Sequence, residues 1–213
     1  MKEISKQKQF LNLKAELSTA SFWDDFAIMA STSISNACVF DKSQEASYLE
    51  VVRKYSAIEL EKFIQCLAIT GKALAENPHD FLGEVIQKDQ SNKNDMDQFF
   101  TPSYVSSLMA GLIDEDSDTL TVCDPTCGTG SLVIGEIAYL KEKGVDYEKR
   151  LQISCSDLDK TVLRLCYVQL SLLNVKARCE VKDFFKGKAI QTLYTPACYN
   201  PENKINEQME LLG

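Results

Sequence analysis

The chain has 213 residues, of which 45% are hydrophobic and 25% charged, and its formal net charge is -8. These totals are typical of a soluble globular protein with one core, or of one domain with a helical extension. We find no apolar run long enough to span a bilayer and no N-terminal leader, so we expect a cytoplasmic protein without membrane contact. Proteins that hold DNA alone normally present a basic face, so this acidic chain is expected to bind DNA only weakly by itself.

The eight cysteines predict neither disulfides nor a metal site. Free cysteine inside an apolar segment behaves as a small hydrophobic side chain, and five cysteines have this setting: Cys66, Cys123, Cys155, Cys166 and Cys179. Cys123 and Cys127 are four residues apart, but no second pair complements them, and His79 is the only histidine. We therefore expect no bound metal.

Residues 1–95 predict a helical region. Between about residues 7 and 86, apolar residues recur at helical spacing. Ser56 is the expected N-cap of one helix, with Glu59 three residues later as in a capping box. Asn77-Pro78 ends that helix, a further element starts near Phe81, and the polar residues 91–95 form the expected connector.

Residues 96–213 predict an α/β domain. Thr101 followed by Pro102 fits a helix start. Strands are then predicted at residues 119–123, 151–155 and 177–181, with helices at 131–143 and 160–173 between them. This alternation with short links favours a parallel sheet with right-handed crossovers. Residues 192–199 contain Pro196 and are expected to be irregular.

The glycine loop, Asp124 to Gly130, lies between the first strand and its helix. Gly128 and Gly130 allow a sharp turn and close approach of a ligand, and the following helix offers free N–H groups and the positive end of its dipole. Asp157 ends the second strand, where a carboxylate can accept hydrogen bonds from ribose hydroxyls, and Asp183 follows the third. Ligands of such sheets lie outside the carboxyl ends of the strands, so all three segments should border one crevice.

Each of these features has a plainer interpretation. The loop could be a tight turn without a ligand, and Asp157 could be a solvated turn residue or a helix cap. Their occurrence at successive strand ends favours a cofactor site of the nucleotide type. The stretch from Gly130 to Asp157 is longer than the roughly 20 residues of the dinucleotide fingerprint, which disfavours a plain NAD site.

The segment Asp97-Gln98-Phe99-Phe100-Thr101-Pro102, one helix ahead of the Asp-Pro-x-Cys-Gly-Thr-Gly loop, resembles the N6-adenine DNA methyltransferases. The likeness covers most of residues 80–198, and the motif also resembles that of the modification subunits of type I restriction systems. Residues 81–84, 167–171 and 193–196 also resemble short methylase-like proteins of phages and mobile elements. The resemblance implies a Rossmann-like S-adenosylmethionine-dependent methyltransferase core, here a partial parallel sheet, with S-adenosylmethionine as cofactor.

The resemblance also implies the residues that bind this cofactor. They are Phe99, Phe100, Thr101, Asp124, Pro125, Cys127, Gly128, Gly130, Asp157, Asp183 and Phe184. The first three would border the methionine end, the loop residues would form the floor, Asp157 would hold the ribose, and the last two would contact the adenine ring. The alternative for the two adjacent phenylalanines, Phe99 and Phe100, is packing in the core.

The sequence departs from the family at Asp97, where glycine is usual, and at the catalytic motif. Adenine methyltransferases use Asn/Asp-Pro-Pro-Tyr/Phe, whose aromatic ring stacks on a flipped base. The nearest match, Asn200-Pro201-Glu202-Asn203, lacks the second proline and the aromatic, which leaves Asn200 as the one candidate catalytic residue.

Three functions therefore stay open. The chain could be a methyltransferase acting on adenine N6 in DNA. It could instead be an inactive cofactor-binding pseudo-methyltransferase, serving as a regulatory, decoy or partner subunit of a restriction-modification system. The third is a helical interaction protein with an empty pocket. Three strands leave a sheet edge to be covered by a protein partner, by self-association or by the N-terminal helices.

Overall fold

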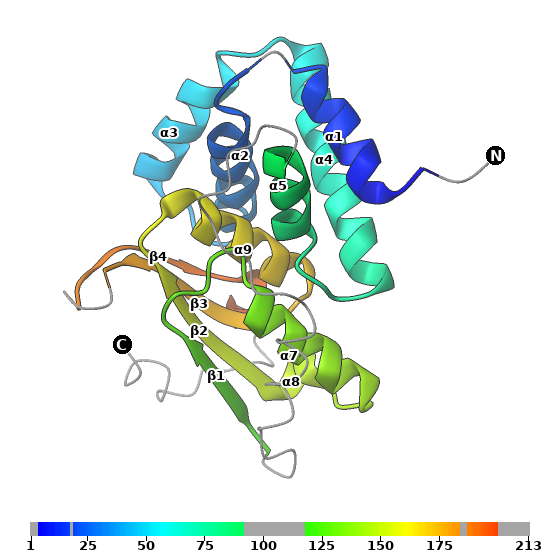
Figure 1. Ribbon diagram of the computed structural model, residues 1–213. Helices are drawn as coiled ribbons and strands as arrows, with labels where there is room; N and C mark the ends of the chain where they lie inside the picture. The colour runs from blue at the N-terminus through cyan, green and yellow to red at the C-terminus, as the bar shows by residue number, and fades with distance from the viewer. Residues whose placement is uncertain (1–3, 18, 92–117, 184–186, 200–213) are drawn as a thin grey trace.

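The computed structural model describes residues 4–17, 19–91, 118–183 and 187–199 (Figure 1). The N-terminal part is helical, with α1 (Lys6–Ala15), α2 (Phe22–Asn36), α3 (Lys42–Val52), α4 (Ala57–Glu76) and α5 (Phe81–Ser91). The C-terminal part contains the strands β1 (Leu120–Asp124), β2 (Leu151–Asp157), β3 (Lys176–Lys182) and β4 (Ala189–Tyr194). Its helices are α7 (Ser131–Glu142), α8 (Tyr147–Arg150), α9 (Lys160–Leu172) and the 3-10 helix η1 (Pro196–Tyr199).

The sheet has the strand order β1-β2-β3-β4. The first three strands are parallel and lie within two residues of their predicted bounds, so the α/β class is confirmed. The expectation of irregular structure at residues 192–199 is wrong. Residues Ala189–Tyr194 form β4, antiparallel to β3, and Pro196 begins η1. Leu193 is the only fully buried residue of β4, so this edge strand lacks the apolar run that marked the others.

The two faces of the sheet differ because side chains alternate along each strand. Cys155 and Cys179 are paired in register and lie on the face covered by α9. The opposite face carries Arg178, Glu180 and Lys182 of β3. Glu180 accepts a hydrogen bond from Arg178 at 2.6 Å and pairs with Lys182 at 3.1 Å, so its buried charge is compensated.

Helix α9 lies between the sheet and the N-terminal helices, of which α2, α4 and α5 contact it (Figure 1). Residues Leu163 and Leu165–Leu170 are all buried, as expected for a helix with protein on opposite sides. A single cluster of buried side chains continues from Phe26 of α2 to Val181 of β3. The N-terminal helices therefore share a core with the sheet, while the domain boundary expected at 95/96 lies outside the described residues. None of the described helices is both long enough and apolar enough to cross a membrane.

Helix α4 begins and ends where the sequence predicts. Ser56 and Glu59 form the expected capping box, in which the Ser56 N–H donates to Glu59 at 2.8 Å. Helix α4 ends at Glu76, with Asn77 as its C-cap. The start of this helix was therefore predictable from its capping box, and its end from Pro78, because the residue before a proline disfavours helical backbone.

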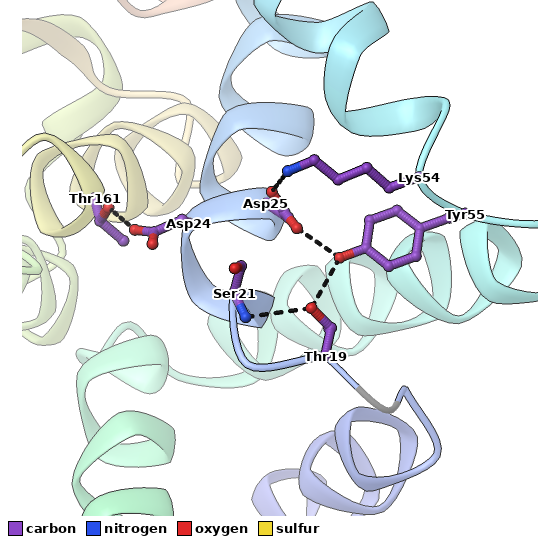
Figure 2. Close-up of polar contacts among 7 residues, drawn as sticks. All are labelled: Thr19, Ser21, Asp24, Asp25, Lys54, Tyr55 and Thr161. Carbon is purple, nitrogen blue, oxygen red and sulfur yellow. Dashed lines mark hydrogen bonds and ion pairs between the residues drawn. The ribbon is translucent and has the colours of Figure 1, made fainter.

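Polar contacts fasten α2 to its surroundings (Figure 2). The buried Asp25 accepts hydrogen bonds from Lys54 at 3.0 Å and from the Tyr55 hydroxyl at 2.5 Å. Burial and the hydrogen bond to Asp25 raise the pKa of Tyr55 to about 12. The neighbouring Asp24 accepts a hydrogen bond from Thr161 of α9, which ties the helical region to the α/β part.

Candidate cofactor-binding site

The carboxyl ends of β1, β2 and β3 meet at one edge of the sheet. The register pairs Asp124 with Cys155 and Asp157 with Val181, so the ends of the three strands lie in a row. The glycine loop, Asp157 and the half-buried Asp183 all follow these ends. The predicted arrangement along one edge is thus confirmed for these segments.

The two loop glycines differ in the surroundings that a Cβ atom would meet. Both have a left-handed backbone, with φ of +54° at Gly128 and +100° at Gly130. A Cβ atom on Gly130 would lie 2.8 Å from the Sγ atom of Cys166, whereas among the described residues, the two chain neighbours aside, no atom lies within 4 Å of the same position on Gly128. Gly130 therefore faces the core, and Gly128 faces away from the other described residues, where a ligand can approach the backbone closely.

The loop is fastened to the end of β2 by three hydrogen bonds. Cys127 N–H donates to the Ser156 carbonyl at 3.0 Å, and the Ser156 hydroxyl donates to the Pro125 carbonyl at 3.1 Å. Gly128 N–H donates to the Asp157 carboxylate at 2.8 Å. The carboxylate predicted to hold a ribose is thus fixed against the glycine predicted to admit the ligand.

Asp157 and Asp159 have separate roles. Each Asp157 oxygen accepts one backbone N–H, from Gly128 and from Asp159 at 2.9 Å. A carboxylate has about four lone-pair sites, so two remain for ligand hydroxyls. Asp159 instead caps α9 by accepting from the N–H groups of Thr161 and Val162.

Asp124 offers a second acceptor at this edge. It is buried, and its Oδ1 atom accepts a hydrogen bond from Thr126 N–H at 3.1 Å. Its Oδ2 atom is buried without a hydrogen-bond partner among the described residues. Burial raises the pKa of the Asp124 carboxyl, and the charge of Asp157 raises it further. Buried polar atoms are normally satisfied, so this oxygen suits a donor group of a ligand.

Several predicted site residues lie outside the described residues: Phe99, Phe100, Thr101, Phe184 and Asn200. Their roles stay predictions. The residue before Asn200, Tyr199, ends η1, which contacts β3. There Thr195 N–H donates to the Ala177 carbonyl at 3.0 Å, near the start of β3. Because β4 is antiparallel, it leads the chain to the sheet edge opposite the glycine loop.

Beneath the loop lies a cluster of thiols. The Sγ atoms of Cys127, Cys155 and Cys166 lie within 4.8 Å of one another, and Cys179 Sγ lies 3.3 Å from Cys155 Sγ. All four side chains are buried in the apolar core. Burial of Cys66, Cys155, Cys166 and Cys179 confirms their predicted behaviour as small hydrophobic groups.

The same expectation is wrong for Cys123, which is exposed. It pairs in register with Ser154, and alternation places both on the face away from α9. The neighbouring Thr121 is exposed for the same reason. Alternation along residues 120–124 was the signal that could have shown this.

Sequence analysis also missed a buried polar network behind the loop. Thr129, only 2% exposed, donates from its hydroxyl to Asp80 at 2.5 Å. Gln169 of α9 donates to Asp80 at 2.8 Å and to the Thr129 carbonyl at 2.9 Å, and it accepts from Leu82 N–H at 3.1 Å. Asp80 lies 49 positions before Thr129 and 89 before Gln169, so no local pattern joins them.

A glycine loop after the first strand and an acidic residue after the second define an α/β protein with a nucleotide-type cofactor edge. Residues 80–197, more than half of the chain, match the family model of the N-6 DNA methylases. The chain belongs to this family.

The proteins similar to this chain include the following two. One is the Type II methyltransferase M.VspI of Vibrio sp. (strain 343), 26% identical over 145 residues, which covers 67% of this chain and 33% of that protein. The other is a crystal structure from Listeria monocytogenes, assigned to the class I S-adenosylmethionine-dependent methyltransferases. It is 22% identical, with a TM-score of 0.42, over 75% of this chain and 53% of that one. The chain thus spans about a third of the length of the curated relative.

Proposed function

We propose that this chain binds S-adenosylmethionine at the edge formed by the glycine loop and Asp157. The observation that carries the proposal is the 2.8 Å hydrogen bond from Gly128 to Asp157, because it joins a ligand-facing glycine to a carboxylate with spare acceptor sites. The residues present fit the cofactor. Asp157 can accept the ribose hydroxyls, and the unpartnered Asp124 oxygen can accept from the cationic amino group.

Bound S-adenosylmethionine would supply an electrophilic methyl group on its sulfonium. Family membership makes adenine N6 in DNA the proposed acceptor. The work of the described residues is to bind and orient: the loop and Asp157 hold the cofactor at the carboxyl edge, and Gly128 admits it close to the backbone.

We further propose that the isolated chain does not itself methylate DNA. Three observations support this. The motif at Asn200 lacks the second proline and the aromatic, and β4 directs the chain to the sheet edge opposite the cofactor loop. The net charge of -8 also disfavours unaided DNA binding. These observations favour a partner subunit of a restriction-modification system as a second candidate function, with a protein partner or a second copy completing the assembly.

Isothermal titration with S-adenosylmethionine tests the binding proposal. We expect a one-site isotherm, and Asp157→Ala should weaken affinity about tenfold or more through loss of charged hydrogen bonds. Asp159→Ala is the matched control, since it removes a neighbouring carboxylate that caps α9. A wild-type chain that gives neither heat nor a thermal shift with the cofactor would contradict the proposal.

Transfer of a tritiated methyl group onto mixed genomic DNA tests the second proposal. The isolated chain is expected to incorporate no label above background, whereas incorporation would overturn the proposed inactivity. Light scattering on the purified chain then distinguishes a monomer from a homo-oligomer.

A further inference from the structure

Three segments that are distant in sequence meet behind the cofactor loop. Asp80 comes from the turn between α4 and α5, Thr129 from the loop itself, and Gln169 from the middle of α9. Asp80 belongs to the helical region, so this network is a direct polar link from that region to the loop.

The hydrogen bonds of this network are complete. Asp80 accepts from Thr129 on one oxygen, and from Gln169 and Gly83 N–H, at 2.8 and 3.0 Å, on the other. The amide of Gln169 uses both of its N–H groups and its oxygen. All contacts to Asp80 come from donors, which suits an ionised carboxylate. Burial raises the pKa of the Asp80 carboxyl, and the three donors act against this rise.

Gly83 of α5 packs closely against the Asp80–Thr129 pair. A Cβ atom on Gly83 would lie 2.2 Å from an Asp80 carboxylate oxygen and 2.6 Å from the Thr129 hydroxyl. Helix α5 therefore approaches the loop through a glycine, in direct contact with the Asp80–Thr129 pair.

Thr129 stands between the two glycines whose left-handed backbones shape the site. Its side chain is held by Asp80 and its carbonyl by Gln169, so the side chain and the peptide unit that joins Thr129 to Gly130 are both restrained. We infer that Asp80 is a positioning residue for the cofactor loop, acting through Thr129. The helical region thereby takes part in cofactor binding without touching the cofactor. This inference rests on the proposed S-adenosylmethionine site.

The test compares full-length variants by titration with S-adenosylmethionine. Thr129→Val removes the hydroxyl and should weaken affinity about tenfold, the value of one charged hydrogen bond. Thr129→Ser keeps the hydroxyl and should restore affinity to within about twofold of wild type. In Asp80→Ala, adding Thr129→Val should cause little further loss, because both changes remove the same contact.

Thr161→Val is the matched control. It also removes a threonine hydroxyl that donates to an aspartate of the helical region, namely Asp24, but away from the loop (Figure 2). It should leave the affinity unchanged within about twofold.

A second readout needs no cofactor. The N–H groups of Gly128 and Gly130 are hydrogen-bonded to Asp157 and to the Cys127 carbonyl, so their hydrogen exchange reports loop order. We expect faster exchange at both amides in Thr129→Val, and wild-type exchange in Thr161→Val.

The outcomes separate the two proposals. If the wild-type chain binds no S-adenosylmethionine, the proposed function fails, and amide exchange alone decides the inference. If the wild type binds and Thr129→Val keeps its affinity, the inference is overturned. If Asp80→Ala does not fold, the Thr129→Val and Thr129→Ser pair still decides the question.

Discussion

The two loop glycines should respond in opposite ways to the same substitution. In Gly130→Ala the new methyl group meets Cys166 Sγ at 2.8 Å, in a backbone with φ of +100°. In Gly128→Ala the methyl group meets no atom within 4 Å in the described part of the chain, its two chain neighbours aside. The first change should therefore cost stability, and the second should cost cofactor affinity.

The expected loss of stability combines three contributions. A left-handed backbone costs an alanine about 1–2 kcal/mol, and overpacking of a filled core costs about 1–3 kcal/mol more. Replacing glycine by alanine also lowers the conformational entropy of the unfolded chain, which stabilises the folded protein by about 0.4–1 kcal/mol. The free energy of unfolding should thus fall by about 2–4 kcal/mol in Gly130→Ala. In Gly128→Ala there is no overpacking contribution, so the free energy of unfolding should fall by about 1 kcal/mol or less.

Urea unfolding followed by circular dichroism measures these differences. Cys166→Ala provides an internal check, because it removes the atom that the new methyl group meets. Alone, Cys166→Ala should lower the free energy of unfolding by about 1 kcal/mol, because it removes buried apolar surface. In the Gly130→Ala background it should instead restore most of the stability lost to overpacking. The reasoning is refuted if Gly130→Ala unfolds at the wild-type urea concentration, or if both glycine variants lose equal stability.

Three further outcomes are expected. Tyr55→Phe leaves the buried Asp25 without one hydrogen bond and should lower the free energy of unfolding by about 1–3 kcal/mol in urea titrations. Of the eight thiols, the exposed Cys38 and Cys123 should react quickly with Ellman's reagent, and the other six only after unfolding; fast reaction of more than two would disprove the buried cluster. Burial acts to raise the pKa of Glu180, but its two basic partners bring it below the ordinary 4.5, so its stabilisation is present above that value and lost as the pH falls through the lower folded pKa. The stability difference between wild type and Glu180→Gln should accordingly shrink in acid, and a difference that grows below pH 4.5 would contradict this sign.

Much of the site could be predicted because its parts depend on local chemistry. Gly128 and Gly130 mark a turn that other residues adopt poorly, and Asp157 ends a strand whose apolar pattern is plain. Parallel pairing then brings these segments together without further information. The capping box at Ser56 was equally local.

What could not be predicted depends on contacts between distant segments. The link from Asp80 to Thr129 follows no spacing rule, since it exists only when α5 packs against the loop. The thiols of Cys155 and Cys166 come from a strand and a helix, so pair spacing gave no sign of their proximity. Strand β4 was missed because pairing with β3, rather than burial of its own side chains, places it in the sheet.

Helix α9 explains why stability and the candidate site depend on the same residues. Cys166 and Gln169 are less than one turn apart on this helix. Cys166 limits the space at Gly130, and Gln169 holds Thr129. The same helix packs against α2, where Thr161 meets Asp24. Gln169 thus contacts the helical region at Asp80 and the glycine loop at Thr129, and Cys166 lies against Gly130. The helical region is best regarded as the outer support of the cofactor edge, since the loop is restrained from β2 on one side and from Asp80 on the other.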